Sequence, residues 1–341
     1  MPIVIQLPEV KREKNERPQD CPNCKGETFQ RWGRVRKHIK DPKLRSVRVY
    51  RYRCTSCQRT FRHYPQGVSR AQQSERMKQL VVVCWALGLS YRGIEKILSA
   101  FGLSLGRMSG WRDVQAAAER LRGRTKWKPA RLVGVDGAWL KGQGVMVAVD
   151  LGDGQPLAIA GIDEKDAAKV LRWLRGLKQR HGIGAIVTDD LGMYRNMADQ
   201  LEVGHQICYF HMRRWVGRTL RSLEGRLSAK SQEILPQVRT VLEELPPNGG
   251  RQLLTFYKQI PGRLRHGQDR TAEDELRRLL IRLSDHWKRY TAFFQDPGLP
   301  WTNNRTEQAI GRMKMRAKTT RGYKTRSGML NGLLISSTDQ S

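Results

Sequence analysis

The stretch Leu132-Val-Gly-Val-Asp136 is a short apolar run that ends on an aspartate, and Ala185-Ile-Val-Thr-Asp189 repeats this pattern further along the chain. Short apolar runs of this kind are typical of buried strands. A third acid follows in Trp301-Thr-Asn-Asn-Arg-Thr-Glu307, where we expect a helix to begin. Converging carboxylates bind divalent cations, and paired Mg²⁺ ions cleave and join phosphodiesters. These three acids are therefore the candidate site.

The residues around the acids predict an ordered series of elements. Strands are expected at 132–139, 145–151 and 157–162, then a helix at 163–180, a strand at 183–188, a helix at 194–201 and a strand at 205–210. Three strands, a helix, a strand, a helix and a strand is the order of the α/β ribonuclease-H-like fold. Because the first and fourth strands are neighbours in that fold, we expect Asp136 and Asp189 to lie side by side.

The charge of the chain favours a nucleic-acid partner. Its 341 residues include 63 Lys and Arg against 32 Asp and Glu, a formal net charge of +31. Such an excess attracts polyanions, and we expect double-stranded DNA. A membrane surface is also anionic, but no apolar run approaches the ~20 residues that cross a bilayer. The N-terminus is too short and broken for a secretory signal, which favours a cytoplasmic, nucleoid-associated protein without a membrane partner.

Four cysteines stand in two matching pairs, Cys21-Pro-Asn-Cys24 and Cys54-Thr-Ser-Cys57. Two such turns supply the four sulfur ligands of one structural Zn²⁺. The alternative is a pair of disulfides, which a reducing cytosol disfavours. We therefore expect a zinc ribbon over residues 1–68.

Helical patterns follow over residues 69–125. An amphipathic helix is expected at 72–89, a second after the N-cap Ser90, and a third from Ser104 or Ser109. Short helices joined by a Gly-containing turn indicate a helix-turn-helix DNA-binding domain. We expect Arg107 and Arg112 on the third helix to contact DNA, with an ordinary helical bundle as the alternative.

Four motifs carry a resemblance to a known family: Val-Asp-Gly at 135–137, Val-Thr-Asp at 187–189, Cys208-Tyr-Phe-His211, and Asn303-Asn-Arg-Thr-Glu307. The chain resembles bacterial DDE-type insertion-sequence transposases of the Mutator-like group. That group places a helical insertion before its final acid. The resemblance implies a catalytic core at 126–211 plus 296–328, interrupted by an all-α insertion at 212–295.

The resemblance also implies a chemistry. Asp136, Asp189 and Glu307 would hold two Mg²⁺ (or Mn²⁺) ions, with which the enzyme hydrolyses transposon ends and transfers their 3′-OH groups to target DNA. Members of the family generally act as homodimers or larger assemblies on DNA.

Each proposed site residue has a competing interpretation. Asp190 adjoins Asp189, and an aspartate before a helix commonly serves as its N-cap. Glu307 fits a capping box that begins at Asn304. Cys208 and His211 have the spacing of two ligands of one metal, but buried packing beneath the site is equally consistent with the sequence.

The C-terminal segment is strongly basic. We expect it to grip phosphates near the cut site, through Arg312, Lys314, Arg316, Lys318, Arg321 and Lys324. Two other functions stay open on the sequence alone. One is a non-catalytic DNA-binding regulator, and the other is a ribonuclease-H-like nuclease that does not transfer strands.

Overall fold

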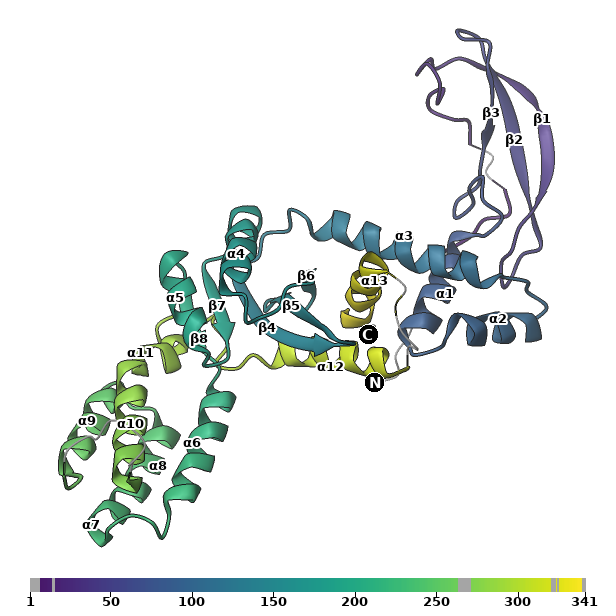
Figure 1. Cartoon of the computed structure of the whole chain (residues 1–341). Helices are drawn as coiled ribbons and strands as arrows, with labels where there is room; N and C mark the ends of the chain where they lie inside the picture. The colour runs from purple at the N-terminus through teal and green to yellow at the C-terminus, as the bar shows by residue number, and fades with distance from the viewer. Residues whose placement is uncertain (1–6, 14–15, 263–270, 320–322, 324, 339–341) are drawn as a thin grey trace. The chain divides into compact units, whose positions relative to one another are not determined.

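The computed structural model describes residues 7–13, 16–262, 271–319, 323 and 325–338. The chain forms two compact units (Figure 1). One unit is Met1–Gly123 with Arg312–Ser341, and the other is Arg124–Gly311. Residues 312–328, which were predicted as part of the core, thus group with the N-terminal elements.

A five-stranded mixed sheet forms the centre of the second unit. Its strands are β4 (Leu132–Leu140), β5 (Gln143–Asp150), β6 (Pro156–Ala160), β7 (Ala185–Thr188) and β8 (Gly204–Ile207). They lie in the order β6-β5-β4-β7-β8. β5 is antiparallel to both of its neighbours, whereas β7 is parallel to β4 and β8. This strand order confirms the ribonuclease-H-like core.

Helices α4 (Ala167–His181) and α5 (Gly192–Gln200) cover one face of this sheet. Because side chains alternate along a strand, Val133 and Val135 of β4 face these helices and pack into the same core as Leu174. Burial of each such side chain contributes about 1.5–3 kcal/mol, as an upper estimate. Gly134 and Asp136 consequently face the opposite side of the sheet.

Two element ends differ from the predictions. β4 continues to Leu140, paired with β5, so Asp136 lies inside a strand and not at its end. β8 stops at Ile207 because its partner β7 ends at Thr188, and these two residues form the last pair. Residues 208–210, predicted as strand, therefore form the beginning of a helix.

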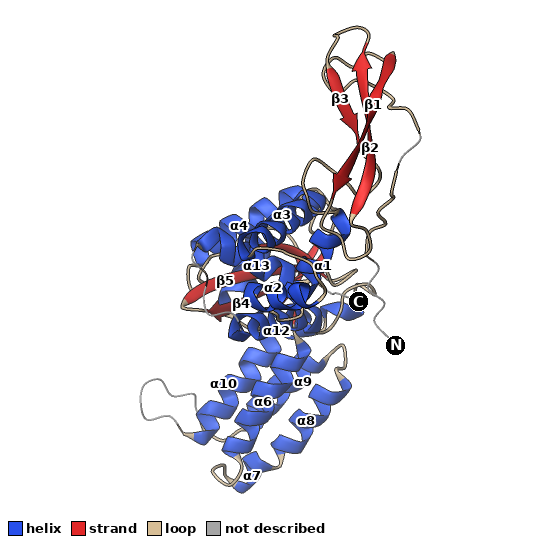
Figure 2. Ribbon diagram, turned by 90° about the vertical axis from the view of Figure 1, so that its right-hand side faces the viewer, coloured by secondary structure: helices blue, strands red, loops and turns tan. Residues whose placement is uncertain are grey.

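The segment between β8 and the last acid is helical in its described part. Its helices are α6 (Tyr209–Leu223), α7 (Ala229–Gln232), α8 (Ile234–Glu244), α9 (Gly249–Gln259), α10 (Ala272–Asp285), α11 (Trp287–Tyr290) and the 3₁₀ turn η1 (Ala292–Phe294). Helices α6, α8, α9 and α10 lie alongside one another (Figure 2). They share a core that buries Leu220, Leu276 and Tyr290. The role of this region as an inserted domain stays a prediction.

The first unit combines a small sheet with helices. β1 (Phe29–His38), β2 (Ser46–Cys54) and β3 (Thr60–His63) form an antiparallel sheet in the order β1-β2-β3. The helices are α1 (Glu75–Ala86), α2 (Tyr91–Ala100), α3 (Arg107–Thr125) and α13 (Arg326–Ser337). Ser90 caps α2 as predicted, by accepting a hydrogen bond from the Gly93 N–H. α1 is shorter than predicted, and α3 begins at Arg107, between the two expected starts.

Helix α12 (Asn304–Thr319) carries Glu307 in its first turn and belongs to both units, since their boundary falls within it. No helix within the described ranges has the length and apolar character needed to cross a membrane.

Candidate active site and metal centres

Asp136 is a half-buried acid on β4, on the sheet face opposite α4 and α5. Its Oδ1 accepts a hydrogen bond of 2.8 Å from the Gly137 N–H. Burial, followed by the negative charges of Asp189 and Glu164, raises the pKa of Asp136 to about 7. A nearby cation would stabilise the charged form of this carboxylate.

Asp189 follows the last residue of β7. The parallel register pairs Gly134 of β4 with Val187 of β7, and each aspartate stands two residues beyond its member of that pair. Asp136 thus lies in β4 and Asp189 directly follows β7, and the prediction that these two strands are neighbours is confirmed. Burial is the main cause that raises the pKa of Asp189 to about 6, and the charge of Glu164 adds to it.

A buried hydrogen-bonded chain lies beneath Asp189. The Thr188 hydroxyl donates to the Asp189 carbonyl over 2.7 Å and lies 2.9 Å from Nε2 of His205. Arg289 donates to Nδ1 of the same ring over 3.1 Å, which leaves Nε2 as the protonated nitrogen. Burial lowers the pKa of His205 to about 3, so the ring is neutral and holds Thr188 in place.

Asp190 has a structural role that differs from the predicted cap. The N-cap position of α5 is Leu191. The Asp190 side chain is 5% exposed and forms ion pairs of 2.6 Å with both Arg195 and Arg282. It also accepts a hydrogen bond of 2.8 Å from the Tyr290 hydroxyl. These contacts occupy Asp190 and leave Asp189 as the acid beside Asp136.

The start of α12 is docked against β4. Asn303 donates a hydrogen bond of 3.1 Å to the Val135 carbonyl, and Arg305 donates one of 2.6 Å to the Gly152 carbonyl. A Cβ atom at Gly134 would overlap the Thr306 hydroxyl, so only glycine permits this approach. The sequence places Glu307 on the next residue.

Glu307 does not have the position that a capping box requires. The helix begins at Asn304, which makes Glu307 its fourth residue and not its third. Its Oε1 is buried without a hydrogen-bond partner in the described chain, and lies 3.5 Å from Nδ1 of His211.

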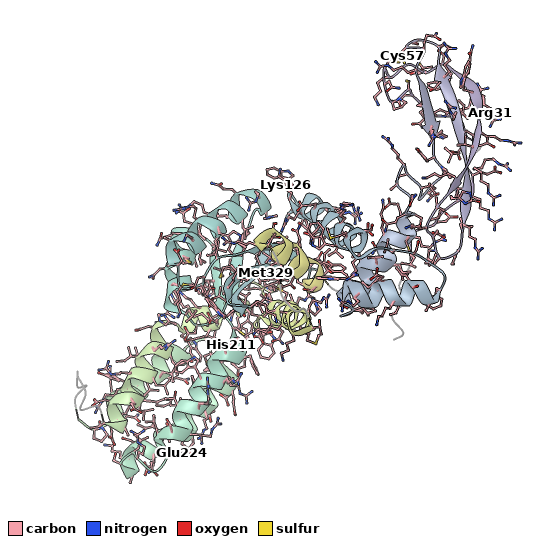
Figure 3. All side chains as sticks on the ribbon, turned by 45° about the vertical axis from the view of Figure 1, so that its right-hand side comes forward. Arg31, Cys57, Lys126, His211, Glu224 and Met329 are labelled. Atoms are coloured by element: carbon pink, nitrogen blue, oxygen red, sulfur yellow. The ribbon has the colours of Figure 1, made fainter. Side chains whose placement is uncertain are left out.

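Cys208 and His211 meet Glu307 at the start of α6, where Figure 3 labels His211. Ligand atoms of these three residues all lie within 4.8 Å of one another. Contact with Cys208, followed by the charges of Glu307 and Asp136, raises the pKa of His211 to about 9. Among the residues that the structure describes, Asp136 and Asp189 do not form such a compact group with Glu307.

Several polar atoms at this point lack a hydrogen-bond partner in the described chain. They are Asn303 Oδ1, Thr306 Oγ1, Glu307 Oε1 and His211 Nδ1, all buried. Native interiors contain few such atoms, and an unseen ion or water is one of their ordinary causes. The three oxygen atoms among them, Asn303 Oδ1, Thr306 Oγ1 and Glu307 Oε1, are of the kind that binds a divalent cation.

Glu164 and Tyr194 are two site residues that the sequence reasoning missed. Glu164 stands just before α4, and its charge acts on both Asp136 and Asp189. The hydroxyl of the fully buried Tyr194 donates to Glu164 over 2.5 Å. The available signal was weak, because Glu164 lies in a polar turn and Tyr194 resembles an ordinary core position.

The four cysteines form a second cluster, and Figure 3 places Cys57 at the tip of the three-stranded sheet. Cys21 Sγ lies 3.8 Å from Cys57 Sγ, and Cys24 Sγ lies 3.5 Å from Cys54 Sγ. All four sulfur atoms lie within 4.8 Å of one another and none is in a disulfide. Backbone N–H groups of Cys57 and Ser56 hold the pKa of Cys54 at about 6. This cluster can hold a structural zinc ion.

Comparison with known proteins bears on the same region. Residues 163–331 match the model of a family described as the transposase IS66 family. An "insertion element ISM1 uncharacterized 48.3 kDa protein" of Methanobrevibacter smithii is 28% identical over 158 residues. The chain is related to insertion-sequence transposases. This confirms the predicted relationship, whereas the Mutator-like subgroup stays a prediction. The match covers 43% of this chain and 36% of the relative, so the chain spans about a third of that protein's length.

A solved structure shows a weaker likeness. The catalytic core domain of BIV integrase is similar to 45% of this chain and is covered over 83% of its own length. Sequence identity is 16% and the TM-score is 0.21. The ribonuclease-H-like fold of this chain therefore rests on its own strand order, β6-β5-β4-β7-β8.

The residues of this chain that were predicted to contact DNA differ in their exposure and in the contacts they already make. Arg112, Lys314 and Lys318 are exposed, and Arg107 is exposed but paired with Glu95 over 3.0 Å. Arg316 is 4% exposed, donates to the Gly88 and Leu89 carbonyls, and lies over the Trp85 ring. It is a structural residue, contrary to the prediction. Arg312 donates twice to the Ser337 carbonyl, and Arg321 and Lys324 lie outside the described residues.

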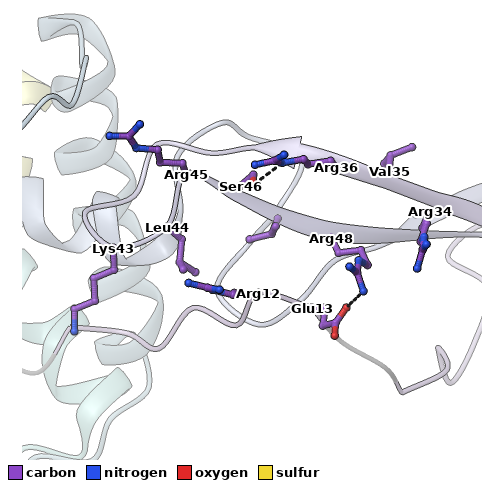
Figure 4. Close-up of a pocket in the computed structure, with 11 residues that line it drawn as sticks. Arg12, Glu13, Arg34, Val35, Arg36, Lys43, Leu44, Arg45, Ser46 and Arg48 are labelled. Carbon is purple, nitrogen blue, oxygen red and sulfur yellow. Dashed lines mark hydrogen bonds and ion pairs between the residues drawn. The ribbon is translucent and has the colours of Figure 1, made fainter.

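A basic cavity that the sequence reasoning did not single out lies beside β1 and β2 (Figure 4). It measures about 790 Å³, and its acid Glu13 is paired with Arg48 over 2.8 Å. The cations that line it are Arg12, Arg34, Arg36, Lys43, Arg45 and Arg48. Such a concentration of positive charge suits a phosphate backbone.

Proposed function

We propose that this chain is a DNA transposase that binds transposon ends, cleaves them, and joins their 3′-OH groups to target DNA. One observation carries the proposal: Asp136 lies in β4, Asp189 directly follows the neighbouring parallel strand β7, and the helix that carries Glu307 is docked beside that sheet. The relationship to insertion-sequence transposases supports the same activity. DDE-type chemistry and strand transfer are part of the proposal.

Asp136, Asp189 and Glu307 are the residues that would hold Mg²⁺ or Mn²⁺ in this proposal. When bound, the ions supply Lewis-acid activation of the attacking oxygen and charge stabilisation at the leaving oxygen. The protein orients the acids: Thr188 and His205 fix the backbone of Asp189. The contact between Thr306 and Gly134 sets the start of α12. His211, whose Nδ1 lies 3.5 Å from Glu307 Oε1, would orient the third acid.

The remaining elements have proposed roles in handling DNA. The zinc ribbon and its basic cavity would contact the phosphate backbone. Helices α1 to α3 would act as the helix-turn-helix, with Arg112 and the half-exposed Trp111 on the accessible side of α3. In this proposal, helices α6 to α11 form an all-α insertion. The chain assembles as a homodimer or larger complex.

The test is a reaction with purified protein, Mg²⁺, labelled transposon-end DNA and a target plasmid. We expect nicked ends and joined products, and Asp136→Asn should abolish both while it leaves end binding intact. Nicking without joining would indicate a plain nuclease. End binding without any cleavage by the unaltered protein would indicate the regulator.

A further inference from the structure

Hydrogen bonds join the starts of helices α6 and α12. Cys208 follows the last residue of β8, and its N–H donates a hydrogen bond of 2.8 Å to the Thr188 carbonyl. The Tyr209 N–H donates one of 2.9 Å to the Trp301 carbonyl. The Asn303 N–H donates to Cys208 Sγ over 3.4 Å. The first turn of α6 is therefore fixed against the segment from which α12 begins.

Each of these helix starts supplies side chains that can bind a metal. Cys208 is the N-cap of α6 and His211 lies three residues later, so both side chains lie on one side of the first turn. Glu307 lies in the first turn of α12. One ligand atom from each of the three residues lies within 4.8 Å of the other two. Cys208 is fully buried and is not in a disulfide.

The spacing of these atoms suits a coordination shell. His211 Nδ1 lies 3.5 Å from Glu307 Oε1, and both atoms are buried without a hydrogen-bond partner in the described chain. Two ligands that each bind a tetrahedral ion at about 2.1 Å lie about 3.4 Å apart. The sulfur atoms of the four-cysteine cluster have similar separations, 3.5 and 3.8 Å. One shared ion would satisfy both orphaned atoms.

The chemistry of the three ligands selects the class of ion. A thiolate and an imidazole favour transition metals such as Zn²⁺, whereas Mg²⁺ prefers oxygen ligands. A helix N-terminus also stabilises an anionic ligand such as the thiolate of Cys208. Three protein ligands leave the fourth position of a tetrahedral ion to water.

We infer that Cys208, His211 and Glu307 form a second site for a thiophilic divalent cation, represented by Zn²⁺, apart from the four-cysteine cluster and from the proposed Mg²⁺ centre. With one protein ligand fewer than the cluster, this site binds its ion less tightly and fills only when zinc is added. A carboxylate has two oxygens, so Glu307 can bind this ion through Oε1 and keep the other oxygen for the proposed centre. The alternative is an ion pair between His211 and Glu307, which requires no metal.

The experiment is a calorimetric titration of the full-length, DNA-free protein with Zn²⁺ at pH 7.5, after one equivalent has filled the cysteine cluster. We expect one further equivalent to bind. Cys208→Ser, His211→Gln and Glu307→Gln should each weaken this step about 100-fold or more, because loss of a residue that merely orients a ligand already costs about 10–100-fold. Cys84→Ser and His286→Gln are the matched controls, since both residues are half-buried and lie outside the group. Thermal unfolding confirms that each variant is folded.

The outcomes separate the inference from its alternatives. A further equivalent that weakens in the three variants and not in the controls supports the inference. Absence of that equivalent overturns it, as does equal weakening in the controls or unchanged binding by Cys208→Ser. A loss in Asp136→Asn as large as that in Cys208→Ser also overturns it, because the ion would then occupy the proposed Mg²⁺ centre. None of these results depends on DNA cleavage, which tests the proposed function separately.

Discussion

At the scale of residues, the ionisation of Asp136 and Asp189 is linked to cation binding at the proposed site. Both acids have a raised pKa, about 7 and about 6, because burial and neighbouring negative charges disfavour their charged forms. A metal ion must displace the protons that these groups retain. The cost of charging the acids is thus linked to the binding of the cation.

The first prediction concerns pH. Below pH 6 both acids largely hold protons and Mn²⁺ must compete with them, whereas at pH 8 both are largely ionised. We therefore expect Mn²⁺ affinity to rise from pH 5.5 to pH 8, by up to about tenfold per pH unit for each proton displaced. Calorimetric titration across this range measures the effect. An affinity that stays constant would show that these acids do not bind the ion.

The second prediction concerns Gly134, on which the Thr306 contact depends. In Gly134→Ala the new Cβ overlaps the Thr306 hydroxyl, so the start of α12 must shift. We expect a loss of about 1–3 kcal/mol in the free energy of unfolding and a loss of about 100-fold in the cleavage rate, since Glu307 moves with the helix.

Gly311→Ala is the control for that experiment. It lies in the same helix with no atom within 4 Å of its Cβ position, and alanine should stabilise the helix by up to about 1 kcal/mol. Normal cleavage by Gly134→Ala would contradict the proposed placement of Glu307.

At the scale of elements, we expect the small sheet to depend on its four clustered cysteines. The apolar residues buried in it include Val10, Ile39, Val47, Val49 and Tyr52. Domains of this size commonly need a metal to remain folded. A zinc ion held by the four cysteines would therefore stabilise β1 to β3.

The third prediction follows from this dependence. Cys54→Ser should reduce bound zinc from about one ion per chain to nearly none and should accelerate amide hydrogen exchange in β1 to β3. Exchange in the core sheet β4 to β8 should not change, because that sheet has its own core. Cys84→Ser, at a half-buried cysteine outside the cluster, is the control. Unaltered protection of β2 in Cys54→Ser would refute a structural zinc.

Element patterns also set the limit of what the sequence could predict. Two signals lie within short stretches of sequence: the apolar runs of β4 and β7, and the two Cys-x-x-Cys pairs. The strand order and the cysteine cluster could therefore be predicted. The start of α6 was mispredicted because Ile207 is the last residue with a pairing partner, which depends on the length of β7. The meeting of Glu307 with Cys208 joins residues far apart in sequence. No local pattern contains that contact.

At the scale of the whole molecule, the two units divide the proposed work. The excess of positive charge extends over the chain, and the basic cavity belongs to the unit with the zinc cluster. The acids belong to the other unit. Helix α12 carries both Glu307 and the exposed Lys314 and Lys318.

The metal preference of Asp136→Cys tests the central claim most directly. A thiolate is a poor ligand for Mg²⁺ and a better one for softer transition metals such as Mn²⁺. We predict that the variant cleaves and joins transposon-end DNA with Mn²⁺ but not with Mg²⁺, whereas the unaltered protein uses both. Equal activity of the variant with the two ions would contradict the claim that Asp136 binds the catalytic metal.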